Sequence, residues 1–287
     1  MGFYRVADLP LEMHTADTVF FAQRMAAYEV PSEGTPAMTL ISEQLPALQA
    51  PPGECTVFPN GVRRVRLPDG RYCNYWFAKS GRVPFQQLYT PDYSDVLLQQ
   101  AADCRCAQLT PTELEYMYTG TAFAWRVQYL GGGVLHSSAI SYCGKGVAFT
   151  ADSGTGKSTH TGLWLRQYPA ETFVINDDKP AIRFEGNKPY LYGTPWSGKS
   201  DQNTNVRVPL HAIVCLHRGA ANTIRRLEPL EALFWISRQM NRPVYDKALG
   251  EKVVDFTRRL VEEVPVYELH CTMEPEAVET VRRELFE

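Results

Sequence analysis

The chain contains a glycine-rich stretch followed by a lysine and two hydroxyl residues, a combination suited to phosphate binding. The stretch begins at Ala151 and continues with Asp152, Ser153, Gly154, Thr155, Gly156, Lys157, Ser158 and Thr159. Glycines let the backbone approach a ligand closely, so that successive N–H groups can point at phosphate oxygens. The lysine ammonium would then reach the β- and γ-phosphates, and the Ser158 hydroxyl would ligate Mg²⁺. We therefore predict a phosphate-binding loop for ATP.

One position departs from the usual pattern G-x-x-x-x-G-K-[ST], because Ala151 stands where the first glycine would be. We interpret this as a turn that needs no positive φ at that residue. The flanking sequence supports the loop: residues 147–150 form a short apolar run typical of a buried strand, and the residues after Lys157 can start a helix. Strand, loop and helix thus occur in the order that phosphate binding requires. A chance match in a surface loop is the alternative.

A second set of candidate residues is the pair Asp177 and Asp178, which ends the strand predicted at 173–178. A carboxylate at a strand end near a phosphate-binding loop can hold nucleotide-bound Mg²⁺, and a second one can accept a proton from an attacking hydroxyl. Taken alone, such a pair usually marks a turn. Together with the glycine-rich loop upstream, the carboxylate pair predicts that this edge of the sheet carries a functional site.

Residues 193–203 form a long polar loop between two predicted strands, and Trp196, Ser197 and Lys199 are its candidates for contact with phosphate or substrate. Loops of this length in compact domains are often functional. The alternative is a flexible surface loop.

Composition narrows the class of protein. The 287 residues exceed a typical single domain, 44% of them are hydrophobic, and the net charge of −3 gives no support to nucleic-acid or anionic-membrane binding. The seven cysteines lack metal-site spacing, which favours reduced thiols, and the N-terminus shows no signal peptide or spanning helix. We expect a cytoplasmic protein.

Periodicity predicts two domains and an α/β (α+β) fold. Residues 1–109 are expected to form a small β-rich domain, with a strand at Thr18–Phe21 and an antiparallel meander at 62–67, 72–77 and 85–89. A helix should begin at Pro111, with Thr110 as N-cap and Glu113 completing a capping box, and run to about Val127.

Residues 110–287 are expected to form the second domain. A strand at 134–140 should pair as a hairpin with the strand before the glycine-rich loop, so we expect a mixed sheet. Further strands are predicted at 181–184, 190–192, 212–216 and 266–269, and helices at 228–240, 247–263 and from Pro275.

The glycine-rich stretch and the two carboxylates make the second domain resemble the HPr kinase/phosphorylase superfamily, whose nucleotide core is related to phosphoenolpyruvate carboxykinase. The resemblance covers roughly residues 132–216. It rests on D-S-G-T-G-K-S at 152–158, on Asp177 and Asp178, and on His136, which precedes Ala151 by fifteen residues as the active-site histidine of that family precedes its loop. Alone, His136 would be read as a strand histidine.

The resemblance implies a phosphate-binding loop in a mixed or largely antiparallel sheet, and it assigns roles. Residues 153–159 would cradle the phosphates and Lys157 would neutralise their charge. Ser158 would bind Mg²⁺ together with Asp178. Asp177 would be the base, and His136 would orient the phosphates or the two carboxylates.

Two departures set limits on that resemblance. Thr159 replaces the glutamate that follows the loop serine in HPr kinases, and the second family signature is absent, with residues 193–199 in about its place. The chain is thus similar to the divergent HPr-kinase-like proteins. We therefore do not carry over three properties of HPr kinases to this chain: HPr as the substrate, phosphorylase activity and the hexamer.

Three functions fit these observations. The first is an ATP- and Mg²⁺-dependent kinase that phosphorylates a serine-type hydroxyl of a peptide, protein or small molecule. The others are a nucleotide-binding regulatory module without transfer and a carboxykinase-like lyase, which would need an oxaloacetate-binding arginine and a second metal site that the sequence does not reveal. The sequence identifies neither the phosphoryl acceptor nor the oligomeric state, and it is compatible with a homo-oligomer.

Overall fold

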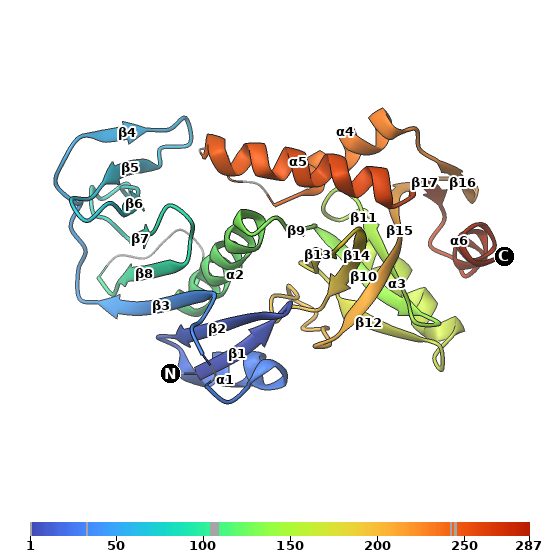
Figure 1. Ribbon diagram of the computed structural model, residues 1–287, viewed down its shortest axis with the longest axis horizontal. Helices are drawn as coiled ribbons and strands as arrows, with labels where there is room; N and C mark the ends of the chain where they lie inside the picture. Colours follow the sequence, from blue (N-terminus) through green and yellow to red (C-terminus); the bar gives the residue numbers. More distant parts are fainter. Residues whose placement is uncertain (1, 33, 104–108, 242, 244–245) are drawn as a thin grey trace. The chain divides into compact units, whose positions relative to one another are not determined.

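The computed structural model describes residues 2–32, 34–103, 109–241, 243 and 246–287 (Figure 1). Within it the chain divides into two compact units, Met1–Tyr129 and Leu130–Glu287. Both are mixed α/β structures built on mixed sheets. None of the helices in the described ranges combines the length and the apolar character needed to cross a membrane.

The first unit is built on an eight-stranded sheet of order β1-β2-β3-β8-β7-β6-β5-β4. Its elements are β1 (Gly2–Val6), β2 (Leu9–His14), α1 (Thr18–Met25), the 3-10 helix η1 (Ala26–Tyr28), β3 (Met38–Leu45), β4 (Cys55–Val57), β5 (Arg63–Arg66), β6 (Tyr72–Tyr75), β7 (Phe85–Tyr89), β8 (Asp95–Ala101) and α2 (Pro111–Tyr129). Strand β3 pairs parallel with β2 and β8, whereas the other pairs are antiparallel. The predicted meander is confirmed as β5, β6 and β7.

The strand predicted at Thr18–Phe21 is wrong, because these residues begin helix α1. Their β-branched and aromatic side chains favour a strand locally. The side chain of Asp17 accepts a hydrogen bond of 3.0 Å from the Phe20 N–H and thereby caps the helix. Phe21 and Met25, one turn apart, are both buried. The cap and the burial of this face override the local preference.

Helix α2 starts at the predicted residue and ends at Tyr129. Thr110 and Glu113 form the expected reciprocal capping bonds, with the Glu113 N–H donating to Thr110 Oγ1 at 3.2 Å and the Thr110 N–H donating to Glu113 Oε2 at 2.8 Å. Arg126, near the end of the helix, pairs with Asp92 at 2.9 Å and donates to the carbonyl of Ala37. The helix therefore lies in the first unit, whereas the sequence-based boundary at 109/110 placed it in the second.

The second unit contains a nine-stranded sheet with the path β12-β10-β11-β15-β14-β13-β9; β17 pairs with β15, and β16 pairs with β17. Its elements are β9 (Gly133–Val134), β10 (Ser137–Tyr142), β11 (Lys145–Thr150), α3 (Lys157–Gln167), β12 (Thr172–Asn176), β13 (Ala181–Glu185), β14 (Lys188–Tyr192), β15 (Arg207–Arg218), β16 (Thr223–Arg226), α4 (Pro229–Gln239), α5 (Lys247–Glu263), β17 (Val266–Cys271) and α6 (Glu276–Phe286).

The predicted hairpin is confirmed: β10 and β11 pair antiparallel and are joined by Cys143 and Gly144, whose φ values of 48° and 76° are both positive. Positive φ at both positions is typical of type I′ turns, which match the twist of the strands they join. Strand β10 also pairs antiparallel with β12, so β11 and β12 run in the same direction. Because of this, the ends of β11 and β12 lie at the same edge of the sheet.

Helices cover both faces of this second sheet. One hydrophobic cluster joins Val147, Phe149 and Val214 of the strands to Trp164 of α3 and Val281 of α6. A second cluster, on the other face, joins strand residues such as Ala148 and Ile213 to residues of α4 and α5. The alternation of Val147, Ala148 and Phe149 between the two clusters follows from the period of two in a strand. The strand that precedes the glycine-rich loop is therefore buried on both sides and rigidly held.

Candidate active site

The glycine-rich loop, residues 151–156, joins the end of β11 to the start of α3, as the sequence predicted. Gly154 and Gly156 have φ values of 79° and 121°, a region that side chains disfavour. A Cβ at Gly156 would also lie 2.7 Å from Cε of Met273. Ala151 has no positive φ, which explains why alanine can replace the usual glycine there. The free N–H groups of the first turn of α3 and its positive dipole end suit an anion.

Lys157 is the first residue of α3 and is only 9% exposed. Its Nζ donates to the carbonyl of Ala151 at 3.0 Å, so the side chain curls back across the loop. Burial lowers the pKa of Lys157 from its usual value, while the carboxylates of Asp178 and Asp177 oppose that effect. An ammonium held in this way can place positive charge beside bound phosphate.

Arg218, at the end of β15, braces the same loop from the neighbouring strand. Its Nη2 donates to the carbonyl of Gly154 at 2.7 Å and its Nε to that of Thr155 at 3.2 Å. Two donors on adjacent carbonyls fix the peptide planes at the tip of the loop. Sequence reasoning missed this residue, because the parallel pairing of β15 with β11 is needed to bring it there.

The two aspartates follow β12 in a turn that Asn176 organises. Asn176 Oδ1 accepts hydrogen bonds from the N–H groups of Asp178 at 2.8 Å and Lys179 at 2.6 Å. Its Nδ2 donates at 2.8 Å to the carbonyl of Thr194. Asn176 is fully buried, so its hydrogen bonds hold this turn from the interior of the protein.

Asp177 accepts a hydrogen bond from the buried hydroxyl of Ser138, which in turn contacts a second buried hydroxyl. Ser138 Oγ, on β10, donates to Asp177 Oδ1 at 2.6 Å, and it lies 2.9 Å from Thr161 Oγ1 on α3. Sequence reasoning missed Ser138, although a polar residue within an apolar strand was a signal that could have found it.

His136 lies in a break between β9 and β10, in the middle of the strand predicted at 134–140. Its N–H donates to the carbonyl of Gln239, and its own carbonyl accepts from Thr150 Oγ1 at 2.8 Å. The imidazole Nε2 lies 3.6 Å from Asp178 Oδ1. Burial lowers the pKa of His136 and Lys157 lowers it further, whereas Asp178 raises it. The ring is therefore neutral near pH 7.

A cavity of about 610 Å³ brings these groups together. It is lined by His136, Ser153, Gly154, Gly156, Lys157, Ser158, Thr159, Asp177, Asp178, Ser197, Gly198, Lys199 and Ser200. Of the residues to which the sequence assigned a binding or catalytic role, Thr155 and Trp196 do not line it. Thr155 faces a second cavity, and Trp196 is 2% exposed, with its carbonyl 3.4 Å from Asn176 Nδ2.

The loop at 193–203 closes one side of this cavity. A Cβ at Gly198, whose φ is 68°, would lie 3.1 Å from Cβ of Asp178. Ser197 Oγ accepts from Asn203 Nδ2 at 2.9 Å, which ties the loop back on itself. Lys199 is exposed at the mouth of the cavity. The loop therefore approaches the acidic pair through a glycine and contributes an exposed lysine to the cavity wall.

The oxygen groups in the cavity suit a magnesium ion. Mg²⁺ in nucleotide sites binds through one or two protein oxygens, with water and phosphate supplying the rest. Ser158 and Asp178 line the same cavity, and the Asp178 side chain is 27% exposed toward it. These residues fit the ion.

No protein-family model and no curated protein matches this chain. Among solved structures, the HPr(Ser) kinase/phosphatase from Coxiella burnetii aligns with 53% of this chain and 95% of its own, at 16% identity and a TM-score of 0.28.

Proposed function

We propose that this protein is an ATP- and Mg²⁺-dependent kinase that transfers the γ-phosphoryl group to a serine-type hydroxyl of a peptide, protein or small molecule. The observation that supports it is a single cavity lined by a glycine-rich loop at a helix N-terminus, by Lys157 and by Asp177 and Asp178. Phosphoryl transfer needs positioning and charge stabilisation, together with a group that accepts the hydroxyl proton. The lining residues offer each of these.

In the proposed reaction, Asp177 accepts the proton of the acceptor hydroxyl as the acceptor oxygen forms a bond to the γ-phosphorus. The bond from that phosphorus to the β,γ-bridging oxygen breaks, and its electron pair leaves with ADP. The Lys157 ammonium and the N–H groups of the loop stabilise the phosphate charge. When bound through Ser158 and Asp178, magnesium supplies further positive charge to the phosphate oxygens. His136, whose Nε2 lies 3.6 Å from Asp178 Oδ1, would orient the phosphates or the two carboxylates.

The acceptor would enter from the side of the loop at 193–203, where Ser197, Lys199 and Ser200 line the cavity. Lys199 would attract a phosphorylated or acidic acceptor or balance the transferred group. The buried Trp196 would support this loop and not touch the acceptor. We place the reaction in the cytoplasm, in keeping with the unpaired cysteines of the described chain.

The test is incubation of the purified protein with γ-labelled ATP and Mg²⁺ in the presence of free serine, other small hydroxyl compounds, peptides and the proteins encoded beside it. Label transfer that disappears in Asp177→Asn and persists in Asp255→Asn would support the kinase. Asp255 is a suitable control because its side chain on α5 is 76% exposed. Tight ATP binding without transfer to any acceptor would instead indicate the nucleotide-binding regulatory module.

A further inference from the structure

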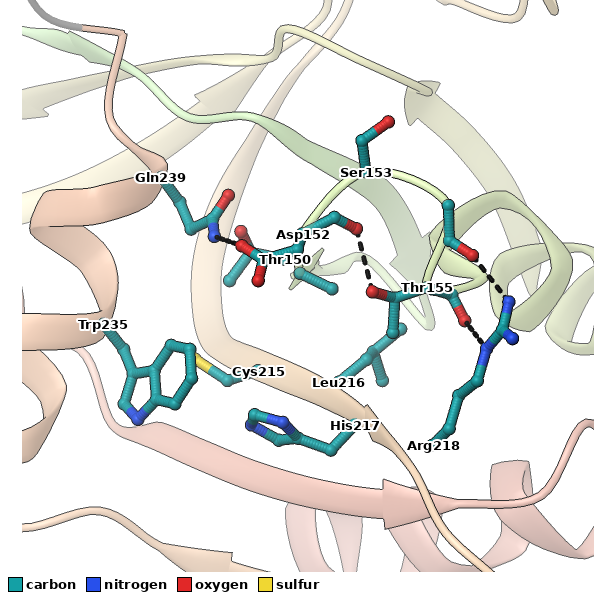
Figure 2. A pocket seen from close by; sticks show the side chains of 12 residues that line it. Thr150, Asp152, Ser153, Thr155, Cys215, Leu216, His217, Arg218, Trp235 and Gln239 are labelled. Atoms are coloured by element: carbon teal, nitrogen blue, oxygen red, sulfur yellow. Dashed lines mark hydrogen bonds between the residues drawn. The ribbon is translucent and has the colours of Figure 1, made fainter.

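A second cavity, of about 370 Å³, lies against the glycine-rich loop (Figure 2). It is lined by Thr150 at the end of β11 and the loop residues from Ala151 to Thr155, by the end of β15 from Cys215 to Arg218, and by Trp235 and Gln239 of α4. Ser153 and Gly154 line this cavity and also the first one. A ligand that crosses the tip of the loop can therefore occupy both.

The walls of the second cavity carry two aromatic rings. Trp235 and His217 meet edge to face, with ring centroids 4.9 Å apart and an interplanar angle of 74°. Both side chains are half-buried and lie on the same side of the cavity in Figure 2. Burial lowers the pKa of His217, although Glu268 opposes this, so the imidazole is neutral near pH 7. His217 also stacks on His270 with centroids 5.0 Å apart, and the Arg238 guanidinium lies 5.4 Å from the Trp235 ring centroid. The ring surfaces that line the cavity can pack against a flat heterocycle.

Hydrogen-bonding groups line the same cavity as these rings. Gln239, one helical turn after Trp235 on α4, donates through Nε2 to Asp152 Oδ1 at 3.0 Å, and Figure 2 shows this bonded pair apart from the rings of Trp235 and His217. The Asp152 side chain is 68% exposed. A carboxylate and an amide side by side provide acceptors and donors for sugar hydroxyls.

The two cavities differ in the part of a nucleotide that each can hold. The first contains Lys157 and both catalytic carboxylates, but no Trp, Tyr or Phe among its described lining residues. The second contains the rings and lacks a lysine, and its Arg218 already donates to two loop carbonyls. An acceptor hydroxyl bound in the second cavity would not reach Asp177, which lines only the first. The acceptor therefore belongs to the first cavity.

We propose that the second cavity holds the nucleoside of the phosphoryl donor, with the nucleobase against Trp235 and His217 and the ribose hydroxyls near Asp152 and Gln239. The phosphate chain then passes Ser153 and Gly154 into the first cavity. This assignment rests on the proposed function, because it takes the ligand of the glycine-rich loop to be a nucleoside triphosphate. In this assignment the second cavity recognises the nucleoside, and phosphoryl transfer takes place in the first cavity.

The experiment compares the affinities of ATP and inorganic tripolyphosphate, each with Mg²⁺, by isothermal titration calorimetry. Trp235→Ala should weaken ATP binding by roughly 10-fold, the size expected for one base–aromatic contact, and leave tripolyphosphate binding unchanged. Trp235→Phe should retain most of the ATP affinity. Leu230→Ala, on the same helix and 79% exposed in the wild type, is the matched control. Because Trp235 packs against the core, His217→Ala provides an independent variant with the same expected readout.

The results separate the two proposals. Wild-type ATP affinity in Trp235→Ala and in His217→Ala, or an equal loss for ATP and tripolyphosphate, would overturn the nucleoside assignment and leave the kinase intact. Failure of the wild-type protein to bind either compound would overturn both. Selective loss of ATP affinity together with absence of phosphoryl transfer to any acceptor would support the nucleoside assignment and contradict the kinase.

Discussion

The hydroxyl of Ser138 donates a hydrogen bond of 2.6 Å to Oδ1 of Asp177, from one strand to the end of its antiparallel neighbour. Ser138 is fully buried, so the donor end of this bond is shielded from water, whereas Asp177 lines the cavity. Hydrogen bonds to charged groups are stronger than neutral ones, particularly where water is excluded. The carboxylate proposed as the base is therefore held in one orientation by a residue that does not itself line the cavity.

Ser138→Ala should lower kcat by roughly 10-fold to 100-fold, because a bond to a carboxylate contributes about 1.5–3 kcal/mol. The KM for ATP should stay close to that of the wild type, since the phosphate-binding groups are untouched. Steady-state kinetics measures both. Ser141→Ala is the control: Ser141 lies on the same strand, is equally buried, and its hydroxyl has no hydrogen-bond partner within the described residues. Equal effects of the two substitutions would refute the positioning role.

Lys157→Ala and Asp177→Asn should separate binding from chemistry. Loss of the Lys157 ammonium removes the charge proposed to face the phosphates, so we expect ATP affinity to fall by at least roughly 10-fold and transfer to be abolished. Asp177→Asn keeps the shape of the side chain and should leave ATP affinity within about 2-fold while turnover falls by roughly 100-fold or more. Calorimetry and label transfer together distinguish these outcomes. Near wild-type turnover in Asp177→Asn would show that another group accepts the proton.

Gly198→Ala should impair transfer, because a methyl group there would press on the Asp178 side chain. Displacement of a catalytic group by about 1 Å can lower the rate by roughly 100-fold. Gly186→Ala is the control for backbone strain, since Gly186 also has a positive φ but its added Cβ would meet nothing within 4 Å. Both variants should lose a similar amount of stability in urea denaturation. A comparable loss of activity in both would mean that strain alone explains the effect.

The buried His160 should make folding stability depend on pH. Burial lowers its pKa from 6.5 to about 4 in the folded protein. Between these values the unfolded chain binds the proton and the folded one does not, so stability falls as the pH falls from about 6.5 to about 4. The shift corresponds to about 3 kcal/mol.

His160→Gln should remove this contribution while keeping an acceptor for the indole N–H of Trp164, which donates to His160 at 3.2 Å. Urea denaturation at pH 7 and pH 4 measures the difference. Between pH 7 and pH 4, the free energy of unfolding should fall by about 3 kcal/mol more in the wild type than in the variant. Parallel losses in the two proteins would show that His160 is protonated in the fold.

Local pattern was enough to predict the parts of the site that lie on consecutive residues. The apolar run before the loop and the carboxylates after the next strand are read directly from the order of residue types, and the capping box at Thr110 fixed one helix start. The contacts of Ser138 and Arg218 were not predictable in this way, because they depend on which strands become neighbours and in what register. The same holds for Thr18–Phe21, where a cap and burial outweighed local preference.

The two-residue turn at Cys143 and Gly144 has a consequence for the order in which this sheet assembles. Hairpins with short loops form within microseconds, since little chain entropy opposes their closure. By contrast, β15 pairs with β11 only after a long intervening segment has been brought together, and parallel pairing is intrinsically slow. We therefore expect the strand that carries the glycine-rich loop to be paired on one side long before Arg218 can reach the carbonyls of Gly154 and Thr155. During refolding, the loop would acquire its final shape late, on a strand that had formed early.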